Sequence, residues 1–368
     1  MFVRQVNHIL VKFILSQTFV GEIMKIFKQI KYITISIAAI SFFIISFDKI
    51  EAKVIGKFAH GAASTSEYGK TITEFANRVN ARTNTLEIQV FGDGSFGGTQ
   101  TLIEGVQLGM IHLSPAGYGS LGAFVPEFGA MELPFIFGRE LDVEKVLKVT
   151  ESDLFEEWQG MLNKKVGARV VAPVWYYGHR DILVKKAATS PSGLKGMKIR
   201  VVPAPLYVEI MKALGAVPTP VDWPEVYNAL KQGLIDGADA ATDSIEYMKF
   251  YEGADHYLGT HHITGLNAMI ANKEWYDSLS TSDKLILGDQ LVWFQNNFSK
   301  RLQGIKPGVL KRLSEKGVTI HNIDLNAFKN SVKKAKVAQK VSKAGKWRSN
   351  TLDRFRSVLT NAGFEVNF

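Results

Sequence analysis

The sequence predicts an α/β protein whose sheet is covered by helices. From about residue 54 onward, strand-like and helix-like patterns alternate with short turns between them, which is typical of this class. No internal repeat of about 20 to 50 residues is visible, which argues against a solenoid or a propeller. The chain has 368 residues, enough for two domains with sizeable cores. It contains no cysteine, which excludes disulfides, thiol catalysis and thiolate zinc sites.

The first 52 residues carry the features of an export signal. An apolar run over residues 33–47 follows three lysines and precedes the small residue Ala52. An apolar run of about 15 residues fits a cleaved signal better than a membrane span, which needs about 20. We therefore expect residues 1–52 to be an N-terminal extension and signal peptide, with the true start at Met24 and the mature chain beginning near Lys53. A retained N-terminal anchor is the alternative.

The positive charge of the chain is concentrated near its C-terminal end. The formal net charge is +9, and residues 331–350 hold seven basic residues and no acidic one. Such a run can indicate nucleic-acid binding. An exported protein meets no nucleic acid, so we expect no such partner and favour a solvated helix face. Contact with a membrane surface or a partner protein is the alternative.

The segment from residue 54 to residue 100 predicts strand, helix, strand and a tight turn. Residues 54–58 and 86–90 read as strands, and a cap at Ser64, Thr65 or Ser66 opens the helix between them. The glycine-rich run FGDGSFGGTQ lacks both the Gly-Lys-Ser/Thr ending and the G-x-G-x-x-G pattern of phosphate-binding loops. We expect it to be a turn that leads into a helix near Thr99.

Four residues of this first part are candidates for a ligand cleft. Ligands of open α/β sheets bind beyond the carboxyl ends of the strands. His60 follows the first strand, Thr99 begins a helix, and Gly117 and Tyr118 follow a strand predicted over residues 111–116. Core packing is the alternative for Tyr118, and a hydrogen-bonded structural role is the alternative for His60.

Two arginines twenty positions apart are the strongest candidates for ligand binding. Arg200 stands in the alternating pattern of a half-buried strand, so its side chain should leave the sheet on the face opposite Ile199. Arg180 follows an aromatic-rich run that we also expect to end a strand. The planar guanidinium of arginine matches a carboxylate or phosphate in two parallel bonds. The alternative is an ordinary surface salt bridge.

The remaining elements follow from the same patterns. We expect a helix over residues 141–163, a strand over 168–174 that leads into Trp175, an extended segment over 217–221, a helix after Trp223, a long helix over 282–302 and a strand over 318–320.

The order of five motifs indicates a family. GHR, LKGMKIRVVP, LGAVPTP, EVYNAL and LIDG occur with the order and spacing found in solute-binding proteins of TRAP (tripartite ATP-independent periplasmic) transporters, which this chain resembles. The resemblance extends to about Asp277. It implies a two-lobed periplasmic-binding-protein-like fold with a ligand cleft between the lobes and long helices bridging them. The implied parts are lobe I over residues 53–175, lobe II over 176–262, a return to lobe I with a long helix over 263–305, and a C-terminal helical segment on lobe II over 306–368.

The resemblance also implies roles for individual residues. Arg200 corresponds to the arginine that grips the ligand carboxylate, and Arg180 corresponds to a second arginine that assists it. Trp223 corresponds to an aromatic residue that lies over the ligand, and Trp175 is a further candidate contact.

One position departs from the family members that bind sialic acid. These have Glu-Asn where this chain has Asp239-Ala240. Alanine cannot donate a hydrogen bond, so a polyhydroxylated sugar acid would leave a polar group unpaired at a cost of about 1 to 3 kcal/mol. Asp239 and Ala240 therefore predict a pocket for a smaller or less polar organic acid.

The function implied is capture of an organic acid outside the cytoplasm, in the periplasm, and its delivery to a small and a large TRAP membrane subunit. We expect no catalysis, since no G-x-S-x-G motif and no other constellation of catalytic residues occurs. We also expect no cofactor. We expect no metal centre, because the neighbours His261 and His262 should face opposite sides of a strand. Asp239 and Asp243 could still hold a cation beside the carboxylate. The alternatives are an exported α/β enzyme acting on a carboxylate and the solute-binding subunit of an ATP-driven importer.

Overall fold

The computed structural model describes residues 7–8, 11–12, 17, 20–31, 53–138, 141–366 and 368. The chain divides into two compact units, Met1–Ala52 and Lys53–Phe368. In the first unit, residues 20–31 are helical, and the predicted apolar signal segment over residues 33–47 lies outside the described residues. None of the described helices combines the length and the apolar character that a membrane span requires.

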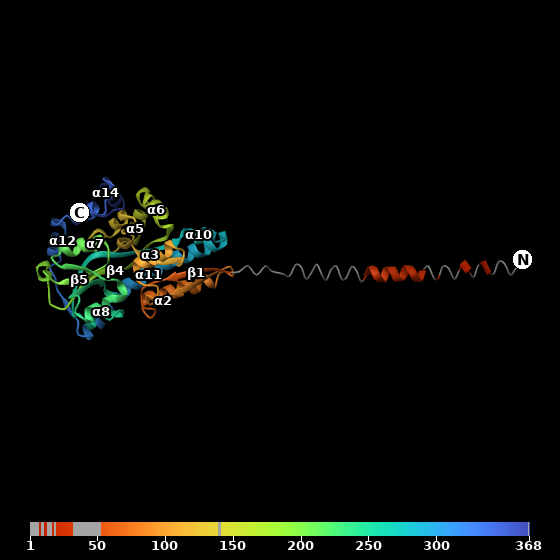
Figure 1. The fold of residues 1–368 in the computed structure, drawn as a ribbon, viewed down its shortest axis with the longest axis horizontal. Coiled ribbons are helices and arrows are strands. Elements are labelled where there is room, and N and C mark those ends of the chain that lie inside the picture. The colour runs from red at the N-terminus through yellow and green to blue at the C-terminus, as the bar shows by residue number, and fades with distance from the viewer. Residues whose placement is uncertain are drawn as a thin grey trace. The chain divides into compact units, whose positions relative to one another are not determined.

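The strands of the second unit form one mixed sheet (Figure 1). Its order is β2-β1-β3-β8-β4-β7-β5-β6, and β9 pairs with β8. The two middle strands, β4 and β8, run antiparallel to each other over their whole length. At one side of the sheet β1 and β2 pair in parallel, and at the other side β5 and β6 do so. The strand bounds are β1 Val54–Ala59, β2 Leu86–Phe91, β3 Leu113–Gly117, β4 Ala168–Val184, β5 Lys198–Val201, β6 Val217–Pro220, β7 Gly237–Ala241, β8 His256–Asn272 and β9 Thr319–His321.

The long strands β4 and β8 connect the two halves of the sheet. Each has 17 residues, so β4 is much longer than the strand predicted over residues 168–174. Its pairing with β8 shifts register four times, including between Tyr176 and Gly178 and between Arg180 and Ile182. Because each irregularity interrupts the alternation of side chains, the pattern of a single strand is not visible in the sequence.

The helices follow the predicted order, with two differences. The helix predicted over residues 141–163 is two helices, α5 and α6, because the Ser152 hydroxyl accepts from the Phe155 amide at 3.3 Å and caps a new helix. The helix predicted over residues 282–302 is longer: α11 has 35 residues. The bounds are α2 Glu67–Asn80, α3 Thr99–Gln107, α4 Tyr118–Leu121, α5 Val143–Thr150, α6 Asp153–Val166, α7 Pro205–Ala213, α8 Val226–Lys231, α9 Thr242–Tyr247, α10 Lys273–Ser278, α11 Thr281–Glu315, α12 Leu325–Lys334, α13 Val337–Ala344 and α14 Thr351–Asn361, with short 3₁₀ helices at Pro126–Glu132, Pro191–Leu194, Trp223–Glu225 and Phe250–Glu252.

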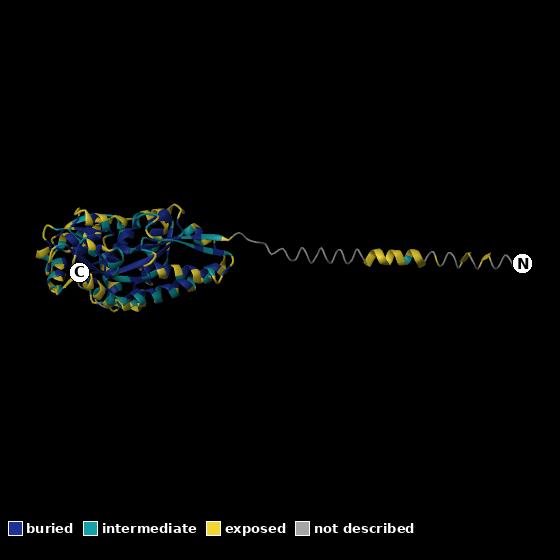
Figure 2. Cartoon of the chain, turned by 90° about the horizontal axis from the view of Figure 1, so that it is seen from below, coloured by how far each residue is buried: buried dark blue, intermediate teal, exposed yellow. Residues whose placement is uncertain are grey.

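Aromatic packing anchors α11 on the sheet. The ring of Trp175, in β4, lies 4.6 Å from that of Phe294 and 5.3 Å from that of Phe298, and 5.4 Å from that of Tyr68 on α2. Figure 2 shows buried strands beneath helices whose outer faces are exposed. Trp175 is therefore a core residue, and this is a correction of its prediction as a ligand contact.

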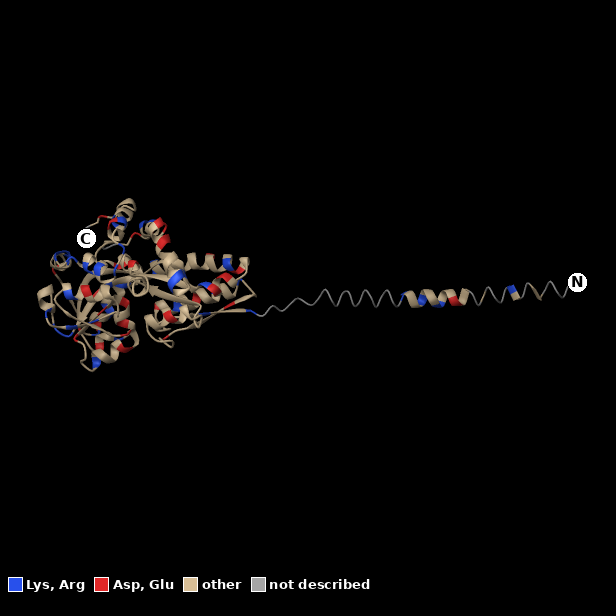
Figure 3. Ribbon diagram, turned by 45° about the horizontal axis from the view of Figure 1, so that its top comes forward, with Lys and Arg blue, Asp and Glu red and all other residues tan. Residues whose placement is uncertain are grey.

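The basic C-terminal region forms a solvated helix face. Lysines of α12, α13 and their flanks are exposed, while Val332, Val337 and Val341 are buried beneath them. Figure 3 colours the lysine and arginine positions of this region blue along the ribbon. The alternation of exposed lysines and buried valines is that of amphipathic helices whose basic face is exposed.

Candidate functional site

A cavity of about 120 Å³ lies where the two halves of the sheet meet. Its wall includes residues that follow β1, β3, β5 and β7, together with residues of β4 and β8. This position agrees with the rule that ligands bind beyond the carboxyl ends of strands. Of the predicted site residues, four side chains line the cavity: Thr99, Arg180, Arg200 and Trp223.

Two predicted contacts of the first part lie in the core instead. Tyr118 is fully buried, its hydroxyl donates to the carbonyl of Pro173, and its ring packs 5.7 Å from that of Phe128. His60 is also buried, 6.3 Å from the ring of Phe58, and burial lowers its pKa to about 4. Neither residue lines the cavity, although Gly117 does. Strand-end position alone predicted them, and it does not determine which way a side chain points.

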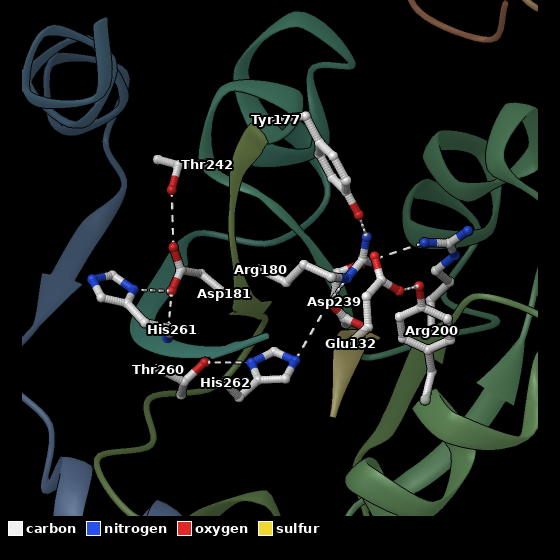
Figure 4. A network of polar contacts seen from close by, with 11 residues as sticks. Glu132, Tyr177, Arg180, Asp181, Arg200, Asp239, Thr242, Thr260, His261 and His262 are labelled. Carbon is white, nitrogen blue, oxygen red and sulfur yellow. Dashed lines mark hydrogen bonds and ion pairs between the residues drawn. The ribbon is translucent and has the colours of Figure 1, made fainter. Parts of the chain in front are cut away.

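Arg180 is held in place by an acid of the neighbouring strand. It is 5% exposed; its Nε donates to Asp239 Oδ1 at 2.7 Å, and an Nη donates to the Asp239 carbonyl at 2.8 Å (Figure 4). The other Nη donates to the Tyr177 hydroxyl at 3.3 Å. The charge of Arg180 is therefore neutralised inside the protein, and Asp239 acts behind the arginine rather than on the cavity wall.

Arg200 has no such acid. It is 1% exposed, and its described hydrogen bonds go to two backbone carbonyls, Val221 at 2.9 Å and Asp239 at 3.3 Å. Its guanidinium lies 5.2 Å from the ring centre of Trp223. No carboxylate among the described residues forms an ion pair with it, and burial together with Arg180 lowers its pKa to about 10. It remains charged at neutral pH, and a buried charge without a counter-ion is costly.

The prediction that His261 and His262 face opposite sides is confirmed. His262 Nε2 lies 3.6 Å from Asp239 Oδ1, while His261 Nδ1 lies 2.6 Å from Asp181 Oδ1 (Figure 4). Burial would raise the pKa of Asp239, but Arg180 and His262 outweigh it and hold the pKa at about 2. No group of three or more metal-binding side chains occurs in the part of the chain that the structure describes.

Ala240 does not lie where the specificity argument placed it. It is fully buried in the core around β7, and the cavity wall at this point is formed by Ala241. Successive residues of a strand face opposite sides, so Ala241 shares its face with Asp239. The expectation of a smaller or less polar acid therefore loses its basis, because it assumed that Ala240 meets the ligand.

A buried pair that the sequence analysis missed joins α7 to the 3₁₀ helix Pro126–Glu132. The hydroxyl of Tyr207, on α7, donates to Glu132 Oε2, which also accepts from the Gly119 amide at 2.8 Å. Burial raises the pKa of Glu132 to about 7, although the hydrogen bond from Tyr207 opposes the rise. Glu132 and Tyr207 are 75 positions apart, and no local pattern marks either of them.

We expect Tyr207→Phe to lower the free energy of unfolding by about 1 to 3 kcal/mol, because a buried carboxylate then loses one of its two donors. Urea denaturation at pH 7.5 measures the change. Tyr227→Phe is a matched control, since that hydroxyl donates to Glu252 at 2.6 Å at an exposed position. An equal loss of unfolding free energy in both variants would show that the buried hydrogen bond to Glu132 stabilises the protein no more than the exposed one to Glu252.

Comparisons with known proteins identify the family. Residues 58–341 match the family model described as bacterial extracellular solute-binding protein, family 7. The chain belongs to this family. The 2,3-diketo-L-gulonate-binding periplasmic protein YiaO of Escherichia coli is 26% identical over 279 residues, covering 75% of this chain and 84% of that protein.

Solved structures of TRAP periplasmic solute-binding proteins share the fold of this family member. One from Fusobacterium nucleatum, with bound sn-glycerol-3-phosphate, is 27% identical at a TM-score of 0.77 and covers 84% of this chain and 98% of its own. Another from Actinobacillus succinogenes, with bound L-galactonate, is 27% identical at a TM-score of 0.76, with coverages of 83% and 99%. The two-lobed periplasmic-binding-protein fold expected from the sequence motifs is thus confirmed.

Proposed function

We propose that this solute-binding protein captures an organic carboxylate outside the cytoplasm and delivers it to the small and large membrane subunits of a TRAP transporter. One observation carries the proposal: Arg200 lines the cavity, is buried and has no acidic partner within the described residues. A bound carboxylate would give Arg200 a counter-ion and would accept two parallel hydrogen bonds from its guanidinium. Two similar proteins support a carboxylate ligand: the Escherichia coli relative is named for binding 2,3-diketo-L-gulonate, and the Actinobacillus succinogenes structure holds L-galactonate.

The proposed lobes are residues 53–175 with 263–305, and residues 176–262 with 306–368. In this arrangement Arg180, Arg200 and Trp223 reach the ligand from one lobe and Thr99 reaches it from the other. The proposed location is the periplasm after removal of residues 1–52, and N-terminal sequencing of the cell-made protein tests it. A membrane-bound product that retains residues 33–47 would contradict it.

A thermal-shift screen of organic acids tests the function. A ligand at a hundred times its dissociation constant should stabilise the protein by about 2.7 kcal/mol. We expect stabilisation by a carboxylate and recovery of that acid unchanged after long incubation. Chemical turnover of the acid would favour the exported enzyme instead, and a neighbouring ATPase gene would favour the ATP-driven importer.

A further inference from the structure

The charges of the cavity wall do not match an acid that carries only a carboxylate. The wall holds two arginines and two aspartates, Asp222 and Asp243. Arg180 is already paired with Asp239, which lies behind it. The unpaired positive charge of Arg200 is thus set against two aspartates on the wall, and a ligand that brings only a carboxylate would leave the wall with an excess of negative charge. A ligand that also brings a positive charge would correct this imbalance.

Asp243 is the acid whose surroundings best suit a cation. It follows β7, is half-buried, and forms no ion pair with a lysine, arginine or histidine among the described residues. Burial raises its pKa to about 7, and the nearby carboxylate of Glu246 adds to the rise. Asp243 is therefore charged above neutral pH but lacks a counter-ion.

Three tyrosines line the same cavity as this acid. They are Tyr68, Tyr177 and Tyr247. Burial raises the pKa of Tyr68 and Tyr247, and the negative charge of Asp243 adds to both rises. The three tyrosines come from α2, β4 and α9. The negative face of an aromatic ring attracts a cation, and rings around an acid form the usual cage for an ammonium group.

The other two rings of the wall already have cations of their own. Arg180 lies 5.1 Å from the ring centre of Tyr207, and Arg200 lies 5.2 Å from that of Trp223. The cavity wall therefore has an arginine part that lacks an anion and a tyrosine-lined part with an acid that lacks a cation. Tyr177 joins the two parts, because its hydroxyl accepts from Arg180.

We propose that the ligand is an acid that also carries a cationic nitrogen, with its carboxylate on Arg200 and its nitrogen beside Asp243, Tyr68, Tyr177 and Tyr247. A primary ammonium would bind mainly through the carboxylate of Asp243, and a methylated ammonium mainly through the rings. This inference rests on the proposed function, because it takes Arg200 as the carboxylate site.

The test compares two matched series by isothermal titration calorimetry at pH 8: the ω-amino acids from glycine to 6-aminohexanoate, and the unsubstituted acids from acetate to hexanoate. We expect at least one amino acid to bind about tenfold or more tightly than the acid of equal chain length. Unsubstituted acids that bind as well as their amino partners at every length, or amino acids that do not bind at all, would overturn the inference.

Two variants locate the nitrogen and separate the inference from the function. Asp243→Asn should abolish most of the amino acid's advantage without lowering the melting temperature, since burial already favours the neutral side chain. Asp289→Asn makes the same charge change at an exposed ion pair with Arg82, away from the cavity, and should keep the advantage. Loss of the advantage in Asp289→Asn, or its retention in Asp243→Asn, would overturn the assignment to Asp243. If Arg200→Ala abolishes binding of both series but the parent protein prefers no amino acid, the inference of a nitrogen site is wrong and the proposed function stands. If Arg200→Ala changes no affinity, the proposed function falls as well.

Discussion

Replacing Arg200 by alanine should weaken carboxylate binding by about 30-fold to several thousand-fold. Removing one partner of a desolvated charge pair costs about 2 to 5 kcal/mol, and 1.4 kcal/mol corresponds to a factor of ten. Arg200 is poised for such a pair because two backbone carbonyls orient its guanidinium, and no acid among the described residues competes for it. Calorimetric titration with a hit from the thermal-shift screen measures the loss.

Three further variants make the Arg200 result specific. Arg200→Lys should restore binding only in part, since an ammonium cannot make two parallel bonds. Arg180→Ala should also weaken binding, although part of that effect would come from leaving Asp239 unpaired. Arg82→Ala, at an exposed ion pair with Asp289, should bind like the parent protein. Parent-like affinity of Arg200→Ala would show that the carboxylate binds elsewhere.

Replacing Asp239 by alanine should lower the free energy of unfolding by about 3 to 5 kcal/mol. Asp239 is fully buried and pairs with Arg180 at 2.7 Å. Without it, two buried arginines would lie side by side with no acid between them, and an uncompensated buried charge carries a penalty of this size. Urea denaturation at pH 7 measures the change, and circular dichroism shows whether the variant still folds.

The exposed pair Arg82–Asp289 is the matched control. Asp289→Ala should cost at most about 1 kcal/mol, because solvent screens a surface ion pair. The double variant Arg180→Met with Asp239→Leu should be more stable than Asp239→Ala alone, since it leaves only Arg200 charged. Equal losses at Asp239 and Asp289 would contradict the account of a buried pair.

Lowering the pH should reproduce part of the loss of stability that we expect for Asp239→Ala. The pKa of Asp239 is about 2 in the folded protein, below the usual value of about 3.9 in an unfolded chain. A depressed carboxyl pKa contributes stability that is complete above the unfolded value and is lost as the pH falls through the folded one. We therefore expect a loss of stability between about pH 4 and pH 2 that is smaller in Asp239→Ala than in the parent.

Several features were predictable because they depend on neighbouring residues in the sequence. Alternation placed Arg200 on a strand, the cap at Ser66 placed α2, and Thr99 begins α3 as expected. Local patterns determine such features because the repeat of a helix or strand extends over only a few residues.

Other features depended on contacts between distant segments. Trp175 and Tyr118 follow the same local rules as true wall residues, and only packing against α11 and Phe128 places them in the core. The buried pair of Glu132 and Tyr207 could not be predicted either, because neither residue carries a motif and the two are 75 positions apart in the sequence.

By itself, the sequence determined the α/β class, the family and the two arginines, because spacing and order along the chain carry this information. Only the tertiary structure decided that Asp239 neutralises Arg180 while Arg200 forms no ion pair among the described residues, and that Asp243 lines the same cavity as three tyrosines. The physical reason is that the energy of a buried charge depends on which groups surround it in space. Those groups come from strands and helices far apart in the chain, so no local pattern contains them.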